Sequence, residues 1–276
     1  EPLGVELHQT VYALDSTTID LCLSLFPWAR FRSTKGAIKL HTLLDVRGPI
    51  PTMIAISEGK QADVRVLDAL IPEPGAFYVV DRGYVDFARL YRFVLASAFF
   101  VTRTKVGIQF NRLESRPVNR TSGLRSDHIV WLTNPKSVAH YPDRLRRVSY
   151  RDPEDGKILI FLTNNFDLPA LVIAQLYKLR WRVELFFKWI KQNLRIKHFF
   201  GNSDNAVKTQ VWIAISVYVL VAILKKELRL ERSLYEILQI LSVALFERVP
   251  IHQALSLTAV PDPTIDSCNQ LPLFDL

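Results

Sequence analysis

The most regular pattern of hydrophobic and polar residues in the chain lies between Leu168 and Leu194. Apolar residues recur there every three or four positions, which is the period of a helix with one buried side. Pro169 suits a first helical turn, and no further glycine or proline occurs before Gly201. The pattern predicts one continuous helix over 168–194, whose apolar side consists of Leu176, Leu179, Val183, Phe186, Phe187, Ile190 and Leu194.

A narrow polar stripe runs beside this apolar side. At 100° per residue its five members fall within roughly 80° of one another. They provide one carboxylate, three cations and one phenol. A solvated helix face with a Glu–Lys pair explains such a stripe equally well, and that pair stabilises a helix by only about 0.3–0.5 kcal/mol. The members of the stripe are Tyr177, Arg180, Glu184, Lys188 and Lys191.

The rest of the chain reads as an α/β core that is interrupted once. Short β-like pieces at 129–133, 145–150 and 158–163, separated by arginine-rich loops, indicate a β insertion over 105–164. The predicted core is therefore 1–104 with 165–205, followed by C-terminal helices and a poorly ordered tail within 206–276. Outside the insertion, the predicted strands are 9–15, 35–45, 50–57, 76–80 and 98–102. The predicted helices there, besides 168–194, are 63–70, 86–96, 206–228 and 233–246.

The positive charge of the chain is concentrated in one segment. Residues 101–151 hold eleven lysines and arginines and three acids, so they carry the whole net charge of +8. A localised basic patch is typical of a protein that binds a polyanion such as DNA, although a solvated basic surface is the alternative. The candidate contacts in or beside it are Arg103, Lys105 and Arg146.

Cysteine usage and hydropathy exclude several classes of protein. Two cysteines far apart, Cys22 and Cys268, predict a reducing compartment and no disulfide framework. The longest apolar run, 211–224, is 14 residues, shorter than the roughly 18–20 that span a bilayer, so we expect a buried helix and no membrane span.

Three acids stand out by position. Asp15 lies on or at the end of the first strand, Asp81 directly follows the apolar strand 76–80, and Glu184 lies mid-helix. Sites in open α/β sheets collect at strand ends, and converging carboxylates require a cation. Oxygen ligands favour Mg²⁺ or Mn²⁺, and two such ions about 4 Å apart can act on a phosphodiester. Each acid alone is weak evidence, since Asp15 and Asp81 also suit turns or caps.

At these residues the chain resembles a known family. Tyr177-x2-Arg180-x3-Glu184-x6-Lys191 is similar to the Y-R-E-K signature of bacterial insertion-sequence DDE transposases. Asp81-x-Gly83-Tyr84 and Asp15-Ser16-Thr17 resemble their other two acidic motifs. The resemblance covers roughly residues 10 to 200.

The resemblance implies a ribonuclease-H-like mixed sheet, with two Mg²⁺ or Mn²⁺ ions held by Asp15, Asp81 and Glu184. It implies cleavage at the ends of a mobile element and strand transfer into target DNA, by a dimer on DNA in the bacterial cytoplasm. Tyr177, Arg180, Lys188 and Lys191 would hold phosphates. Trp131, or as a second candidate Trp181, would stack on a flipped base, although ordinary packing also explains Trp131.

Three alternatives remain at this point. A standalone nuclease on the same fold would give free ends without joined products. A non-catalytic DNA-binding remnant would bind through the basic insertion without a metal. A sugar hydrolase with two carboxylates explains neither the basic insertion nor the cations beside Glu184. Family members usually carry an N-terminal domain that recognises the element's ends; we see none before Asp15 and expect that one is missing.

Overall fold

The computed structural model describes residues 9–194, 196, 198–244 and 250–256. The chain forms two compact units, Glu1–Val219 and Leu220–Leu276. The expected ends of the core at 104, 164 and 205 remain a prediction. The expected disorder of the tail beyond Pro261 concerns residues outside the described part of the chain.

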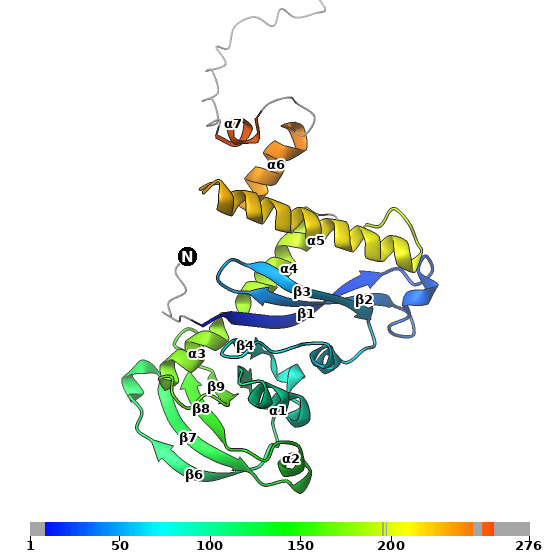
Figure 1. The fold of residues 1–276 in the computed structure, drawn as a ribbon. Helices are drawn as coiled ribbons and strands as arrows, with labels where there is room; N and C mark the ends of the chain where they lie inside the picture. The colour runs from blue at the N-terminus through cyan, green and yellow to red at the C-terminus, as the bar shows by residue number, and fades with distance from the viewer. Residues whose placement is uncertain (1–8, 195, 197, 245–249, 257–276) are drawn as a thin grey trace, which may run out of the picture. The chain divides into compact units, whose positions relative to one another are not determined.

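The first unit is built on a mixed nine-stranded sheet (Figure 1). The strands lie in the order β3-β2-β1-β4-β5-β9-β8-β7-β6. β1 pairs with β4 and β4 with β5 in parallel, and the remaining pairs are antiparallel. The mixed α/β fold expected from the sequence is therefore confirmed. The strands are β1 Val11–Leu21, β2 Gly36–Asp45, β3 Ile50–Glu58, β4 Phe77–Val80, β5 Phe99–Arg103, β6 Phe110–Arg116, β7 Leu124–Leu132, β8 Leu145–Arg151 and β9 Ile158–Thr163.

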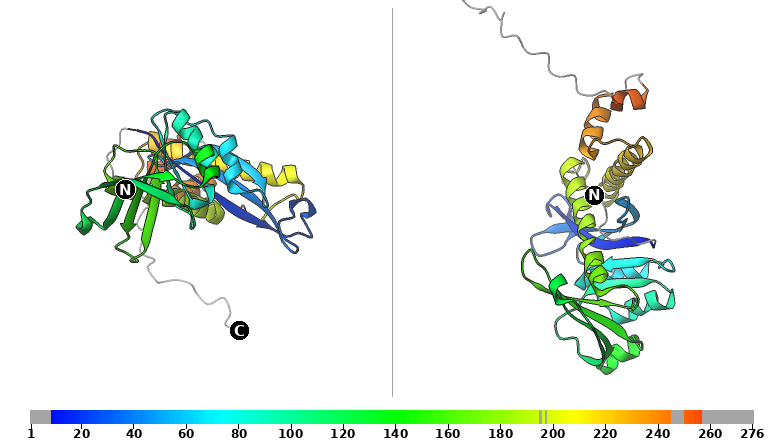
Figure 2. Two further views of the ribbon diagram at one scale, coloured as in Figure 1. Left: turned by 90° about the horizontal axis from the view of Figure 1, so that it is seen from below. Right: turned by 90° about the vertical axis from the view of Figure 1, so that its left-hand side faces the viewer.

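Helices cover both faces of the central strands. On one face, Tyr12 and Leu14 of β1 pack into a core with Tyr78 and with Phe93 of α1 (Phe87–Leu95). The ring centroids of Tyr12 and Tyr78 are 5.2 Å apart. On the other face lie α3 (Ala170–Lys178) and α4 (Trp181–Asn193), which Figure 2 (right) shows in front of the strands. Because side chains alternate along a strand, β1 sends Asp15 to the α4 face and Ser16 to the α1 face.

The helix expected over 168–194 is broken, and that prediction is wrong at its centre. Residues 179 and 180 form a turn between α3 and α4. In this turn the backbone amides donate hydrogen bonds to the carbonyl three residues earlier instead of four. Leu179 donates to Leu176, Arg180 to Tyr177, and Val183 to Arg180. This tightening needs no glycine or proline, which is why the sequence pattern missed it.

The basic segment contains one strand more than expected. The three predicted β pieces correspond to β7, β8 and β9, while β6 was missed. β6 is almost entirely exposed, at the edge of the sheet, and its sequence FNRLESR has no apolar alternation. β9 pairs with β5, so these four strands extend the central sheet. The segment also contains a short helix, α2 (Pro135–His140).

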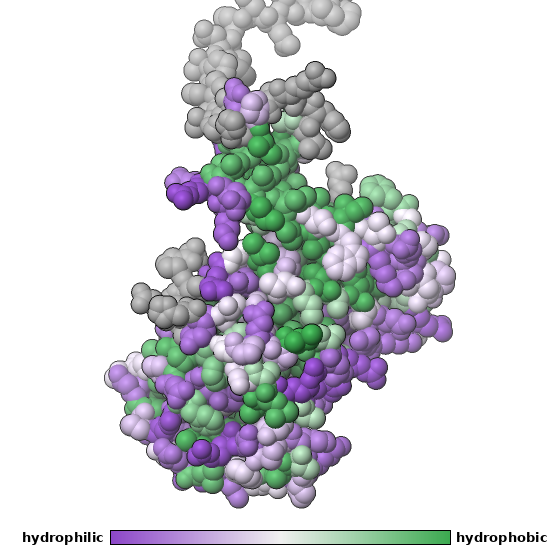
Figure 3. Space-filling view, in the orientation of Figure 1, coloured by the Kyte–Doolittle hydropathy of each residue, from purple (hydrophilic) through white to green (hydrophobic). Residues whose placement is uncertain are grey.

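The helix predicted over 206–228 is α5 (Asp204–Glu227), the one described helix long and apolar enough to cross a membrane by length and composition. About 39% of its most apolar window is buried within the structure. The second unit also contains α6 (Leu234–Ala244) and α7 (Ile251–Ser256). Figure 3 shows apolar residues over α6, where Val243 is 76% exposed.

Candidate active site

The pairing of β1 with β4 places Asp15 and Asp81 side by side. Leu14 lies opposite Val80 in this parallel register. Each acid follows one of these two residues in the sequence, so both come at the same level of strands whose backbones are about 4.8 Å apart. β5 continues the row, because Thr102 lies opposite Val80 and Arg103 follows it. Asp15, Asp81 and Arg103 therefore lie side by side on β1, at the end of β4 and on β5.

Arg180 links Glu184 to this row. Its Nη1 lies 2.5 Å from Oδ2 of Asp15, and its Nη2 lies 2.6 Å from Oε1 of Glu184. The turn between α3 and α4 places Arg180 at the start of α4, where its guanidinium reaches β1. Its Nε is buried and has no hydrogen-bond partner within the described residues. An unsatisfied buried donor is unfavourable, so the two carboxylates are what hold this side chain in place.

Tyr177 and Lys191 fix the flanks of the site. The Tyr177 hydroxyl donates to Oδ1 of Asp81 over 3.0 Å, and its ring is 93% buried against Phe161. Lys191 Nζ donates to Thr17 Oγ1 over 2.6 Å and to the Thr18 carbonyl over 2.9 Å. Four of the five stripe residues thus face the acids or their strand. Lys188 is exposed.

The environment of Asp15 disfavours its charged form. The pKa of Asp15 is raised to about 6. Burial is the main cause, the charge of Arg180 and the hydrogen bond from the Ser16 amide oppose it, and the charges of Asp81 and Glu184 add to it. Asp81 behaves differently. Burial raises the pKa of Asp81 too, but hydrogen bonds from the Arg82 amide and Tyr177, with the charge of Arg180, outweigh burial and leave the pKa below its usual value.

The donor chemistry of the three acids fits a hard divalent cation, since all three are carboxylates and the charges of Asp81 and Glu184 act on the partly buried Asp15. Among the described residues, however, no three His, Cys, Asp or Glu side chains are close enough to form a metal site as they stand. The Arg180 guanidinium bridges Asp15 and Glu184. If these two carboxylates are to hold one ion, the guanidinium must first leave them.

This competition gives a testable prediction for Arg180→Gln. Without metal, the variant leaves two partly buried carboxylates without their counter-charge, so we expect a melting temperature several degrees below that of the parent. Mg²⁺ should raise the melting temperature of the variant more than that of the parent, because the ion no longer competes with a guanidinium. Thermal unfolding with and without 10 mM Mg²⁺ measures both effects. Lys188→Gln, on the exposed side of α4, is the control, and equal Mg²⁺-induced shifts in all three proteins would contradict this account.

Arg146 has a different position from the one expected. It is 2% exposed and pairs with Asp127 through two bonds of 2.9 and 2.7 Å. Its Nη1 also donates to the Leu168 carbonyl over 2.6 Å. Arg146 therefore joins β7 and β8 to the chain entering α3, and we do not carry it forward as a DNA contact.

The remaining predicted contacts lie on accessible parts of the fold. Arg103 is half-buried and its charge acts on Tyr177. Lys105 is exposed and donates to the Val85 carbonyl, beside the loop that follows Asp81. Trp131 is half-buried on β7, whereas Trp181 at the start of α4 is 58% exposed.

Sequence reasoning missed a polar network on the other face of β1. Ser16 Oγ donates to Asp63 over 2.8 Å, and Lys39 Nζ lies 3.0 Å from the same oxygen. The Tyr84 hydroxyl is buried close by, where burial and then the charges of Asp15 and Asp63 raise the pKa of Tyr84. This network supports the β1 backbone directly behind Asp15. Strand alternation could have placed Ser16 on the face of β1 that lies away from Asp15. Nothing near Ser16 in the sequence indicated that its partner would be Asp63.

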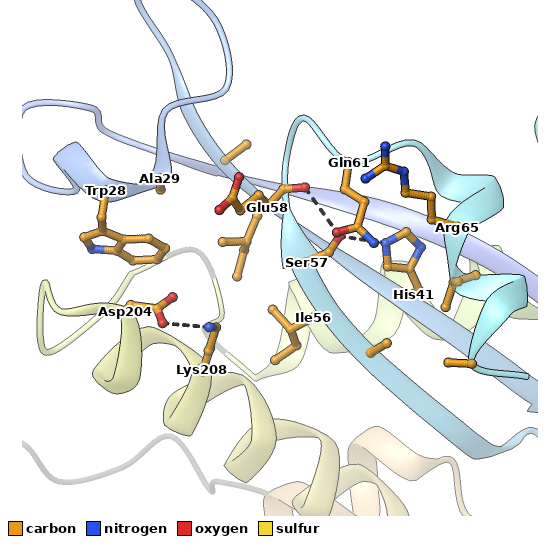
Figure 4. Close-up of a pocket in the computed structure, with 15 residues that line it drawn as sticks. Trp28, Ala29, His41, Ile56, Ser57, Glu58, Gln61, Arg65, Asp204 and Lys208 are labelled. Carbon is orange, nitrogen blue, oxygen red and sulfur yellow. Dashed lines mark hydrogen bonds and ion pairs between the residues drawn. The ribbon is translucent and has the colours of Figure 1, made fainter.

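The structure also contains a cavity of about 570 Å³ (Figure 4). Its lining comes from the loop between β1 and β2, from β2, β3 and residues 61–69, and from the start of α5, and it includes Trp28, His41, Gln61 and Lys208. Asp15, Asp81 and Glu184 are not among its lining residues.

Comparison with known proteins identifies the family of the chain. Residues 6–220 match the family described as Transposase DDE domain. A putative transposase of Sinorhizobium fredii, y4zB, is 33% identical over 239 residues, which is 85% of this chain and 66% of that protein. A probable transposase for the insertion sequence element IS5377 of Geobacillus stearothermophilus is 32% identical over 209 residues, covering 75% of this chain and 54% of that protein.

The fold also has a solved neighbour. The piggyBac transposase, in a synaptic complex with hairpin DNA, aligns with a TM-score of 0.53 over 94% of this chain and 60% of that one, at 11% identity. The likeness concerns the fold, and it agrees with the ribonuclease-H-like arrangement expected from the sequence. The chain spans between about half and two thirds of the length of the curated relatives it matches.

Proposed function

Since this chain belongs to the insertion-sequence transposases with a DDE domain, we propose that it cleaves DNA phosphodiesters at the ends of a mobile element and joins those ends to target DNA. The observation that carries the proposal is the row formed by Asp15 and Asp81 on neighbouring parallel strands, with Glu184 held to it through Arg180. Three acids remote in the sequence thus lie on the same side of the sheet, where Tyr177 bonds Asp81 and Arg180 bridges the other two.

Divalent metal ions are general in this family, and we assign them to Asp15, Asp81 and Glu184 here. Two bound Mg²⁺ or Mn²⁺ ions would supply activation of a water or a 3′ hydroxyl and stabilisation of the departing oxygen. Glu184 comes from α4, which is linked to β1 by the Arg180 bridge and by the bonds of Lys191 to Thr17 and Thr18. Asp15 and Asp81 are fixed by the sheet.

The other residues of the site orient the acids and receive the DNA. Tyr177 holds the Asp81 carboxylate in one orientation through its hydroxyl. Arg180, once released from the carboxylates, is positioned to bind a phosphate as a bidentate donor. Lys188, Arg103 and Lys105 are placed to neutralise the backbone on either side of the cut. Lys191 anchors α4 to β1, so its effect on DNA would come through the position of the helix.

We further propose that the basic strands β6–β9 bind the DNA arm next to the cut, with Trp131 or Trp181 available to stack on an unpaired base. Joining two ends requires two active sites, so we expect a dimer when DNA is bound. The site of action would be the bacterial cytoplasm, where the chromosome is the target.

A strand-transfer assay separates this function from a standalone nuclease. The chain is mixed with pre-cleaved element ends carrying a free 3′ hydroxyl, a supercoiled plasmid and Mg²⁺ or Mn²⁺. A transposase gives plasmid joined to the ends, and EDTA abolishes the product. Nicked plasmid without any joined product would show a nuclease instead, and salt-dependent binding with neither product would show an inactive DNA-binding protein.

The raised pKa of Asp15 predicts the pH dependence of the reaction. Since this pKa lies at about 6, the carboxyl becomes protonated as the pH falls below that value, and a protonated carboxyl does not bind Mg²⁺. At limiting Mg²⁺, cleavage should fall by roughly tenfold per pH unit below about pH 6. More Mg²⁺ should move the midpoint to lower pH, because the ion competes with the proton. A rate that stays constant to pH 5 at limiting Mg²⁺ would contradict the role given to Asp15.

A further inference from the structure

Two connections, remote in the sequence, meet at the far end of β1. One is the loop 22–35 between β1 and β2, and the other is the segment 198–203 between α4 and α5 (Figure 1). Trp28 Nε1 donates to the Asn202 carbonyl over 2.8 Å. The rings of Phe26 and Phe199 meet edge to face with centroids 6.0 Å apart. The two connections therefore form one surface, which we call the tip.

An aromatic side chain projects from the tip on a fixed backbone. Phe200 is 93% exposed. Its amide donates to Gln210 Oε1 over 3.1 Å, while Gln210 Nε2 donates to the His198 carbonyl over 2.7 Å. Leu25, on the other connection, is 59% exposed. Exposing a phenylalanine side chain to water is unfavourable. An exposed phenylalanine whose backbone is held by hydrogen bonds is typical of a residue that contacts a binding partner.

The same surface carries a fixed group of cations. Arg30, Arg32 and Lys35 are exposed on the loop 22–35, which holds no acidic residue and so has a charge of +3. The turn is closed by bonds from the Phe31 and Arg32 amides to the Lys35 carbonyl. The Arg32 guanidinium lies over the Phe31 ring at 5.1 Å.

Acidic neighbours of the tip offset part of this charge. Asp20 precedes the loop, Glu58 lines the same cavity as Trp28 and Ala29, and Asp204, at the start of α5, is paired with Lys208 at 2.6 Å, as Figure 4 shows. With Lys208 counted, four cations and three acids leave a net positive charge. A surface with three cations and two exposed apolar side chains is complementary to a nucleic-acid strand, which offers phosphates and a base face together. A protein partner would need an acidic surface of matching shape.

We propose that the tip, defined by Leu25, Arg30, Arg32, Lys35 and Phe200, binds DNA at an unstacked base, with phosphates on the cations and the base against Phe200. The proposal rests on the proposed function, which makes DNA the substrate, and adds where a second part of that DNA lies. From Asp15 to Leu21, β1 advances by six residue steps, or about 20 Å. At about 3.4 Å per nucleotide, the contacted base lies on the order of six nucleotides from the cut.

The experiment compares two DNA probes in EDTA, so that binding is measured without cleavage. One probe is a 30-base-pair duplex with a three-nucleotide bulge that contains 2-aminopurine, and the other is the fully paired duplex. Fluorescence anisotropy gives the dissociation constants, and quenching of 2-aminopurine reports stacking. The parent should bind the bulged probe more tightly and quench it. Phe200→Ala should bind the bulged probe about 5- to 100-fold more weakly, without quenching, and leave the paired duplex unaffected.

Matched variants separate stacking from charge. Phe200→Trp should restore binding and quenching, whereas Ile71→Ala, which removes an apolar residue 86% exposed elsewhere on this unit, should change neither. Neutralising Arg30, Arg32 and Lys35 to Gln should weaken binding of both probes and reduce the slope of log K against log salt by about 2–3.

The outcomes distinguish the two proposals. If the parent binds DNA and Phe200→Ala binds the bulged probe equally well, the tip is not a base contact, and the proposed function stands. If Phe200→Ala changes the oligomeric state in sedimentation but not DNA binding, Phe200 is a protein contact and the inference is overturned. If the parent binds neither probe, the inference and the proposed function both fail.

Discussion

Glu184→Gln should reduce DNA cleavage and strand transfer by at least about 10³-fold while leaving the fold and DNA binding intact. The change removes one negative charge and one metal ligand without changing the size of the side chain. Divalent ions contribute several kcal/mol of transition-state stabilisation in such sites, and each 1.36 kcal/mol is a factor of ten in rate. The Arg180 guanidinium would retain its bond to Asp15, so little stability should be lost.

Single-turnover cleavage of the element's ends measures this effect, with anisotropy for DNA binding and circular dichroism for the fold. Glu227→Gln is the matched control, because it makes the same chemical change on an exposed residue at the end of α5. If Glu184→Gln cleaves as well as the parent while Glu227→Gln is also unchanged, Glu184 is not a metal ligand and the site is assigned incorrectly.

Asp127→Ala should produce the largest loss of stability among the single substitutions considered. It leaves the Arg146 guanidinium, 2% exposed, without its counter-charge inside the protein. Removing one partner of a buried ion pair typically costs about 3–5 kcal/mol. In a unit of this size that corresponds to a melting temperature lower by roughly 6–20 °C. Because Arg146 also bonds the Leu168 carbonyl, we expect the start of α3 to exchange its amide hydrogens faster.

Two variants test the cause of that loss. Asp155→Ala removes the acid of an exposed pair, in which Lys157 is 73% exposed, and should have little effect on melting. The double variant Asp127→Leu with Arg146→Met removes both charges and should recover much of the lost stability. If Asp127→Ala melts like the parent, the pair is not buried as the structure has it.

The candidate site residues on α3 and α4 could be proposed from the sequence because their spacing is local. Tyr177, Arg180, Glu184 and Lys191 share a face of a helical region, and that needs only the helical period. Asp81 could be found because an acid after an apolar strand stands at the edge of a buried sheet. The parallel pairing that brings Asp15 beside it is a property of the fold, and only the resemblance to a family predicted that meeting.

The failures came from interactions that depend on distant partners or on small changes of backbone geometry. The turn at 179–180 contains neither glycine nor proline, so periodicity carried the helix through it. Arg146 lies in the segment LRRVSYR, where nothing local shows that a carboxylate on β7 would bury it. The Arg180 bridge arises because two acids on separate elements approach the same guanidinium, whereas the resemblance to the family implied only that Arg180 would hold a phosphate.

The most direct test of the central claim is a Mn²⁺ titration followed by electron paramagnetic resonance, in the presence of pre-cleaved DNA ends. The account predicts two bound ions per chain with magnetic coupling between them, and loss of at least one ion in Asp15→Asn, Asp81→Asn and Glu184→Gln but not in Glu227→Gln. Equal Mn²⁺ binding by the parent and all three site variants would show that these carboxylates do not hold the metal.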